Sequence, residues 1–132
     1  MKEPIWIGKE EARVIHQLQL AEHGGPSGLR DQGLFESAMD RPKNLFTYSD
    51  SEPTATLYQL AASYAYGLTK NHAFVDGNKR TAFVVCLSFL KQNGISVTAS
   101  QEMRYLTFYA LAAGDLTEAE LADWLQQNSQ FG

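Results

Sequence analysis

The 132-residue sequence has one cysteine, no excess of positive charge and no hydrophobic stretch long enough to cross a membrane. The single thiol, Cys86, lies among Val and Leu residues, which excludes a disulfide-stabilised scaffold and indicates a reducing compartment. Eleven Lys and Arg against fifteen Asp and Glu give a formal net charge of -4, whereas non-specific binding to nucleic acid requires a positive excess. The longest apolar stretch is about half of the ~20 residues that a membrane span needs. We therefore expect a cytoplasmic protein that binds neither nucleic acid nor a membrane.

What the sequence does contain is an ordinary globular composition, divided by turn signals into about six helices. Its length fits one domain, which we assign to residues 1–132. The fold class that we predict is all-α, with the fourth helix at the centre. The expected helices span about residues 9–22, 31–40, 54–70, 77–92, 100–113 and 117–127, with residues 95–97 as an extended link.

Hydrophobic periodicity predicts which sides of these helices face the core. The helix over residues 77–92 is apolar on nearly all sides, so we expect it to be the most buried one. In the first helix, the residues that share a hydrophobic face are Val14, Ile15, Leu18 and Ala21. In the fifth helix, the corresponding residues are Met103, Leu106, Ala110 and Leu111.

The helix ends carry their own signals. Pro42 is expected to stop the second helix, since proline lacks the N–H that a helix interior needs. Thr117 followed by Glu120 predicts a capping box at the start of the last helix. The segment from Lys43 to Pro53 has no clear period and is interpreted as an exposed loop or small hairpin.

Polar chemistry is concentrated in one ten-residue stretch, His72 to Thr81, directly before an apolar run. A helix that begins here presents free N–H groups and a positive dipole end, which favour phosphate. Gly77 lets phosphates approach the backbone, and Asn78 can donate to a phosphate oxygen. Arg80 can hold two oxygens through its planar fork, and Lys79 supplies a second charge.

Two further residues of this stretch suit phosphoryl transfer. Asp76 is a hard oxygen ligand that could bind a Mg²⁺ ion shared with the phosphates. His72 suits a general base that accepts a proton from an attacking hydroxyl, because the unperturbed pKa of histidine as a residue type is ~6.5. A structural alternative is that His72 caps the third helix, Asp76 caps the fourth, and Lys79 and Arg80 are solvated. However, two cations in a first helical turn oppose the dipole unless an anion binds there.

These residues resemble the Fic/Doc family, whose motif runs His-Pro-Phe-x-Asp/Glu-Gly-Asn-Gly-Arg. Ala73 replaces the proline, and Lys79 replaces the second glycine, which together with Thr81 is similar to the death-on-curing (Doc) branch. The positions that match the motif are His72, Phe74, Asp76, Gly77, Asn78 and Arg80. Residues 24–34, 41–42 and 89–94 also look like Doc proteins.

The resemblance implies a toxin of a toxin–antitoxin system that acts as an ATP-dependent protein kinase. Its implied target is a translation GTPase similar to elongation factor Tu, and its implied antitoxin is a Phd-like protein that inserts a helix into a groove. The segment from Lys43 to Pro53 lies where the family has its target-docking flap. Carried over by position, His72 is the base, Asp76 is the Mg²⁺ ligand, and the phosphate contacts are Gly77, Asn78, Lys79 and Arg80.

Two alternatives remain open at this point. Fic enzymes mostly transfer AMP, so the chain could be an AMP-transferase, although Lys79 fills the space that the second glycine leaves for the β- and γ-phosphates. The chain could also be a non-catalytic partner-binding domain that has kept the fold. The Ser/Thr-x-x-x-Glu-Gly/Asn signature of self-inhibited members is absent, because Met103 follows the nearest match of Thr98 and Glu102. A separate antitoxin is therefore expected.

Overall fold

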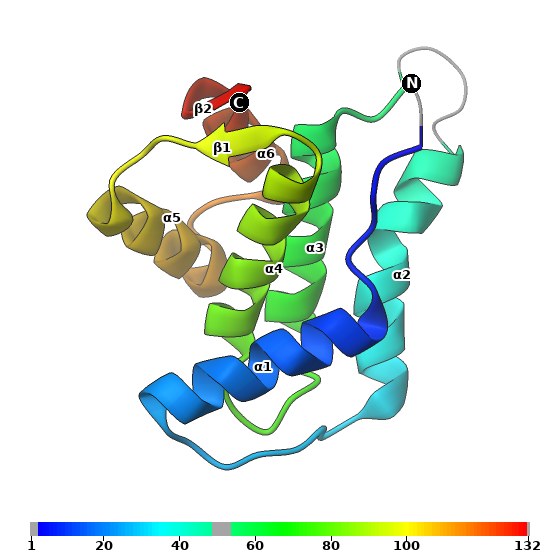
Figure 1. Ribbon diagram of the computed structural model, residues 1–132, viewed down its shortest axis with the longest axis vertical. Coiled ribbons are helices and arrows are strands. Elements are labelled where there is room, and N and C mark those ends of the chain that lie inside the picture. Colours follow the sequence, from blue (N-terminus) through cyan, green and yellow to red (C-terminus); the bar gives the residue numbers. More distant parts are fainter. Residues whose placement is uncertain (1–2, 49–53, 132) are drawn as a thin grey trace.

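A computed structural model describes residues 3–48 and 54–131 (Figure 1). These residues form six helices and one pair of short antiparallel strands. The all-α prediction is therefore confirmed. The helices are α1 (Lys9–His23), α2 (Gln32–Tyr48), α3 (Leu57–Asn71), α4 (Asn78–Gln92), α5 (Gln101–Ala113) and α6 (Glu118–Gln127), and the strands are β1 (Ile95–Val97) and β2 (Ser129–Phe131).

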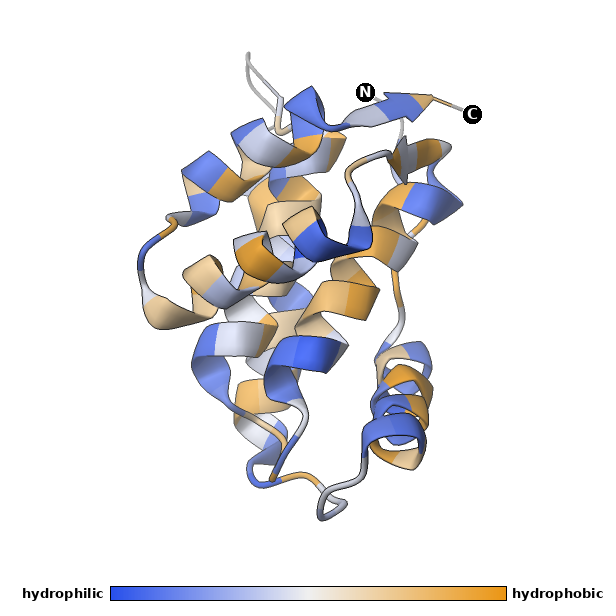
Figure 2. Ribbon diagram, turned by 90° about the vertical axis from the view of Figure 1, so that its left-hand side faces the viewer, coloured by the Kyte–Doolittle hydropathy of each residue, from blue (hydrophilic) through white to orange (hydrophobic). Residues whose placement is uncertain are grey.

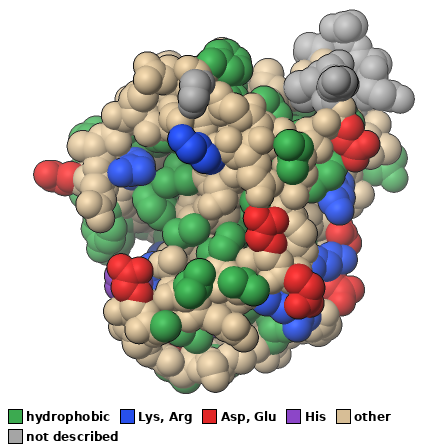
Figure 3. All heavy atoms as spheres, in the orientation of Figure 1, with side chains coloured by type: hydrophobic (Ala, Val, Ile, Leu, Met, Phe, Trp, Pro, Cys, Tyr) green, Lys and Arg blue, Asp and Glu red, His purple; other side chains and the backbone are tan. Residues whose placement is uncertain are grey.

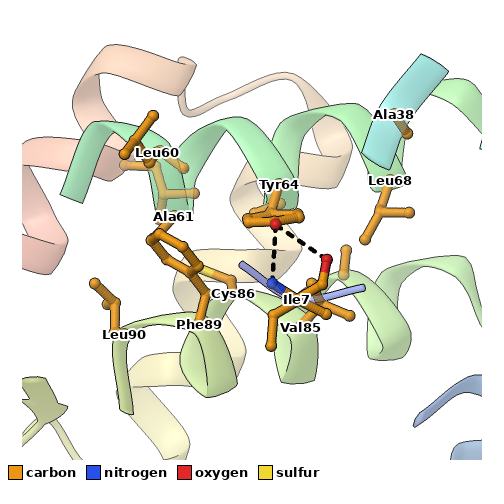
Figure 4. Packing of buried hydrophobic residues seen from close by; sticks show 14 of the residues in the cluster. Ile7, Ala38, Leu60, Ala61, Tyr64, Leu68, Val85, Cys86, Phe89 and Leu90 are labelled. Atoms are coloured by element: carbon orange, nitrogen blue, oxygen red, sulfur yellow. Dashed lines mark hydrogen bonds between the residues drawn. The ribbon is translucent and has the colours of Figure 1, made fainter. Parts of the chain in front are cut away.

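Helices α3 and α4 lie side by side at the centre of the molecule, with α2 and α6 against α3 and α1 across the start of α4 (Figure 1). Their facing sides form the core, where Leu60 and Tyr64 of α3 meet Phe89 and Leu90 of α4 (Figure 4). Figure 2 shows hydrophobic segments concentrated in these middle helices and hydrophilic ones toward the outer turns. The prediction of a central fourth helix is confirmed, and α3 shares that position.

Two buried polar side chains in this core are neutral. The Tyr64 hydroxyl accepts from Ile7 N–H at 3.1 Å and donates to Ile7 C=O at 3.2 Å, which ties the N-terminal segment to α3 (Figure 4). Burial raises the pKa of Tyr64, and it also raises the pKa of the fully buried Cys86 thiol. Cys86 is a free thiol in this structure, in agreement with the expectation of no disulfide-stabilised scaffold, and such a buried thiol is unreactive.

The predicted inward faces of two helices are only partly correct. Leu111 of α5 is buried and Ile15 of α1 packs against the core, but most of the other predicted residues are exposed. In α1 the buried residues are Ala12 and His16, whereas Val14 and Leu18 are exposed. The reason is that His16 occupies the inward position, where its ring stacks on Phe74. In α5 the buried residues are Thr107, Phe108 and Leu111, while Met103 and Leu106 are exposed.

Helix α2 is longer than predicted. It continues through Pro42 to Tyr48 instead of stopping near Asp40. Pro42 is buried, and α3 packs closely against the preceding turn, since a Cβ on Gly67 would lie 3.3 Å from Ala38 Cα. Tertiary packing therefore outweighs the lost backbone hydrogen bond. Residues 43–48 of the expected flap are helical, and the rest of it lies outside the described residues.

The C-terminal part follows its local signals. Thr117 Oγ1 accepts from Glu120 N–H at 3.1 Å and Glu120 Oε1 accepts from Thr117 N–H at 2.9 Å, so the predicted capping box is confirmed. The extended link pairs with the last described residues as β1 and β2. In the described parts of the chain, no helix is both long and apolar enough to span a membrane.

Candidate active site

The ten-residue polar stretch forms the connection between the end of α3 and the start of α4. His72 is the C-cap of α3 and adopts a left-handed conformation with φ 52° and ψ 46°. It is the one non-glycine residue with a positive φ among the described residues. Such a conformation is held in place only when the surroundings fix it, and it is common where a side chain must be aimed.

Backbone pairing from a distant segment fixes this loop. Val75 N–H donates to Gly28 C=O at 3.0 Å, and Arg30 N–H donates to Ala73 C=O at 2.7 Å. The Arg30 side chain adds a bond from Nε to His72 C=O at 2.9 Å. The chain before α2 therefore braces the backbone of the predicted catalytic histidine, a role that no sequence signal assigned to Arg30.

Asn78 is a second brace. Its side chain is buried and makes a two-point contact with Phe74, in which Oδ1 accepts from Phe74 N–H and Nδ2 donates to Phe74 C=O, both at 2.9 Å. This contact fixes the orientation of the amide, so Nδ2 points at His72 Nδ1, 3.3 Å away. Both hydrogens of the side-chain amide are therefore directed at His72 and Phe74 and not at a phosphate. In this arrangement, the predicted phosphate contact of Asn78 would be made by its backbone N–H.

The start of α4 has the properties of an anion site. Its N-cap is Gly77, at φ 78°, with no capping side chain. In the described part of the chain, no partner is found for the backbone N–H groups of Asn78, Lys79 and Arg80. The Asp76 carboxylate is not the N-cap, because its Oδ1 accepts from Gly77 N–H at 2.8 Å. The capping alternative for Asp76 is therefore excluded, and the first turn is open to an anion.

Two cations stand beside these N–H groups without a counter-charge. Within residues 3–48 and 54–131, neither Lys79 nor Arg80 forms an ion pair. Arg80 Nε is buried and lacks a hydrogen-bond partner, which is costly for a charged donor. Lys79 Nζ lies 5.6 Å from the centroid of the Tyr109 ring. Unpaired cations at the positive end of a helix fit a site that binds phosphate groups.

His72 and Lys79 line the same surface pocket, of about 290 Å³, which α5 closes on one side. Asp76 and Arg80 do not line it. The other residues that line the pocket are Thr69, Lys70, Tyr109, Ala112 and Ala113. The structure therefore brings the expected base next to one of the expected phosphate contacts, and it adds Tyr109, which sequence reasoning missed.

Asp76 does not line this pocket, and its carboxylate lies against the glycine-rich loop that follows α1. A Cβ on Gly25 would overlap Asp76 Oδ2 and lie 3.3 Å from Asp76 Cγ, so a side chain here would displace the carboxylate from its present position. The described residues contain no group of three or more His, Cys, Asp or Glu side chains suited to a metal. A lone carboxylate nevertheless suits Mg²⁺, which keeps several waters and binds substrate phosphates.

The fold and the candidate site define a helical domain in which a histidine held by Arg30 and Asn78 lies next to an uncapped helix start. The model of the Fic/DOC family matches residues 6–90, and the chain belongs to this family. It is 33% identical over 121 residues to "Protein kinase doc" of Escherichia phage P1, covering 92% of this chain and 93% of that protein. It is 41% identical over 76 residues to "Toxin Doc" of Mycolicibacterium smegmatis, covering 58% and 57%. The resemblance inferred from the motif is confirmed.

Proposed function

We propose that this protein is the toxin of a toxin–antitoxin system and acts as an ATP-dependent protein kinase. The observation that carries the proposal is the placement of His72 and Lys79 in one pocket beside the uncapped start of α4. Two relatives support it by name, since one is called a protein kinase and the other a toxin.

The residues present fit ATP and Mg²⁺. The free N–H groups of α4, Lys79 and Arg80 would hold the phosphates, and Asp76 would hold the metal ion. ATP supplies the phosphoryl group that is transferred. Such transfer depends mainly on positioning and charge stabilisation, which are the properties of this helix start.

His72 is proposed to accept the proton of the attacking hydroxyl. Because Asn78 Nδ2 is a donor, His72 Nδ1 is the acceptor nitrogen of the neutral ring. Their separation of 3.3 Å is long for a hydrogen bond, so a hydroxyl that enters the pocket can replace Asn78 at little cost. The hydroxyl is proposed to belong to a translation GTPase similar to elongation factor Tu.

The partner is proposed to be a Phd-like antitoxin that covers exposed apolar side chains with a helix. Val14 and Leu18 of α1 are 52% and 60% exposed, and Met103 and Leu106 of α5 are about half exposed. Figure 3 shows hydrophobic side chains gathered over α1, with the surface hollowed between α1 and the lower end of α5. An apolar surface of this kind fits a helical partner.

The experiment that tests the reaction uses two labels. The purified chain is incubated with a translation extract and Mg²⁺, with ATP labelled at either the γ- or the α-phosphate. A kinase transfers label to protein from the γ-position only. Label that is transferred from the α-position only would show AMP transfer instead. If the chain is folded and toxic but transfers neither label to any protein of the extract, both transferase activities are ruled out. The His72→Asn variant is the matched negative control.

The contact between Gly25 and Asp76 gives a second prediction. Gly25→Ala is expected to displace the carboxylate, because Cβ would overlap Oδ2 and φ at this position is +117°. The Mg²⁺ concentration that gives half-maximal transfer should rise about tenfold. Gly24→Ala is the control, since φ is also positive there (+80°) but no atom lies within 4 Å of its Cβ. Equal effects of the two variants would show that backbone strain, and not the carboxylate, is responsible.

A further inference from the structure

His16 contacts the site from α1 without lining its pocket. It is 3% exposed, although histidine is rarely so buried without a specific partner. Its ring lies flat on the ring of Phe74, with centroids 3.7 Å apart and planes inclined by 12°. Its Nε2 lies 2.7 Å from the carbonyl oxygen of Asp76. Because a carbonyl oxygen only accepts hydrogen bonds, Nε2 must carry the proton.

This bond acts on the peptide unit that joins Asp76 to Gly77. The carbonyl of the unit accepts from His16, and the N–H of the same unit donates to Asp76 Oδ1 at 2.8 Å. A peptide unit is planar, so fixing the direction of its carbonyl also fixes the direction of its N–H. The hydrogen bond from His16 therefore determines where the Asp76 carboxylate is held.

The same peptide unit sets the start of α4. Gly77, its second residue, is the N-cap and has a left-handed conformation. A Cβ on Gly77 would lie 3.5 Å from His16 Cδ2, which shows how closely the ring supports this turn. Rotation of this peptide plane would change the backbone conformation of the N-cap, Gly77, as well as moving the carboxylate.

We propose that His16, as the Nε2–H tautomer, is the positioning residue that orients the Asp76 carboxylate and the first turn of α4. It does so by holding the peptide plane between Asp76 and Gly77, and it does not touch the substrate. The part of this inference that concerns Mg²⁺ rests on the proposed function. The parts that concern the tautomer of His16 and the order of the loop over residues 72–81 do not rest on the proposed function.

Two variants separate the hydrogen bond from the packing. His16→Phe keeps an aromatic ring against Phe74 but removes the donor. His16→Gln loses the ring but places an amide N–H₂ near the position of Nε2. His23→Phe is the matched control, because His23 is a partly exposed histidine at the end of the same helix.

Three measurements test the proposal. In the wild type, the ¹⁵N spectrum of the imidazole should show Nε2 protonated. In His16→Phe, amide hydrogen exchange over residues 72–81 should be about tenfold faster, and the Mg²⁺ concentration for half-maximal transfer should rise about tenfold, with a smaller change at saturating Mg²⁺. His16→Gln should recover most of both effects, and His23→Phe should change neither.

An unprotonated Nε2 in the wild type, with the proton on Nδ1 alone, would overturn the proposal, and so would unchanged exchange in His16→Phe. If His16→Phe does not fold, His16→Gln decides: near-normal exchange supports the hydrogen bond, and fast exchange despite a normal melting temperature contradicts it. If the wild type transfers no phosphate, the proposed function fails, while the tautomer and exchange measurements still test the role of His16.

Discussion

Replacing His72 with asparagine is expected to lower the rate of phosphoryl transfer by about 10²- to 10⁴-fold, the usual contribution of a general base. Asparagine is a better test than alanine, because asparagine tolerates the left-handed conformation of this residue but cannot accept the proton. The side chain is exposed, so the melting temperature should change little. Transfer rates and thermal unfolding, measured on the same preparations, check both parts.

Growth arrest provides the second measurement for the same variant. If the protein acts by catalysis, expression of His72→Asn should be harmless at a level at which the wild type arrests growth. The exposed His23 offers a control, since His23→Asn should leave toxicity unchanged. Full growth arrest by His72→Asn, with the protein folded and no transfer detected, would instead support the non-catalytic partner-binding alternative.

The local part of this site could be predicted from the sequence, because its residues are neighbours in the chain. The histidine at the end of α3 and the N-cap glycine at the start of α4, which has no capping side chain, both lie within residues 72–80. The capping box at Thr117 was predictable for the same reason. In each case the interaction spans only a few residues, so spacing alone specifies the geometry.

The non-local part could not be predicted. The pairing of Gly28 and Arg30 with Val75 and Ala73 joins segments more than forty residues apart, and no periodicity marks it. Hydrophobic patterning placed Val14 and Leu18 inward, yet the inward position of α1 belongs to a histidine whose partner is a backbone carbonyl. Hydrophobic patterning therefore does not predict the inward face of a helix where a polar side chain is buried against the loop of the candidate site.

The largest effect on stability is expected from Phe89→Ala, at about 3–5 kcal/mol. Phe89 is fully buried in α4, where its ring stacks on Trp6 with centroids 5.9 Å apart. It is also tilted against the ring of Tyr64, at 5.2 Å between centroids (Figure 4). Removing the ring leaves a cavity where the N-terminal segment, α3 and α4 meet. Since domains are stable by about 5–15 kcal/mol, this change removes a large part of the total.

Chemical denaturation of Phe89→Ala and Phe131→Ala measures this effect against a control of the same residue type. Phe131 is 76% exposed, so its replacement should change the free energy of unfolding by less than about 0.5 kcal/mol. Phe89 lies on the same helix as the proposed phosphate site, about three turns from the first turn of α4. At a temperature where Phe89→Ala remains folded, its Mg²⁺ dependence should match the wild type, because the loop over residues 72–78 is braced by Arg30, Asn78 and His16 and not by this part of the core. A shifted Mg²⁺ dependence in the folded variant would show that the core and the site are coupled along α4.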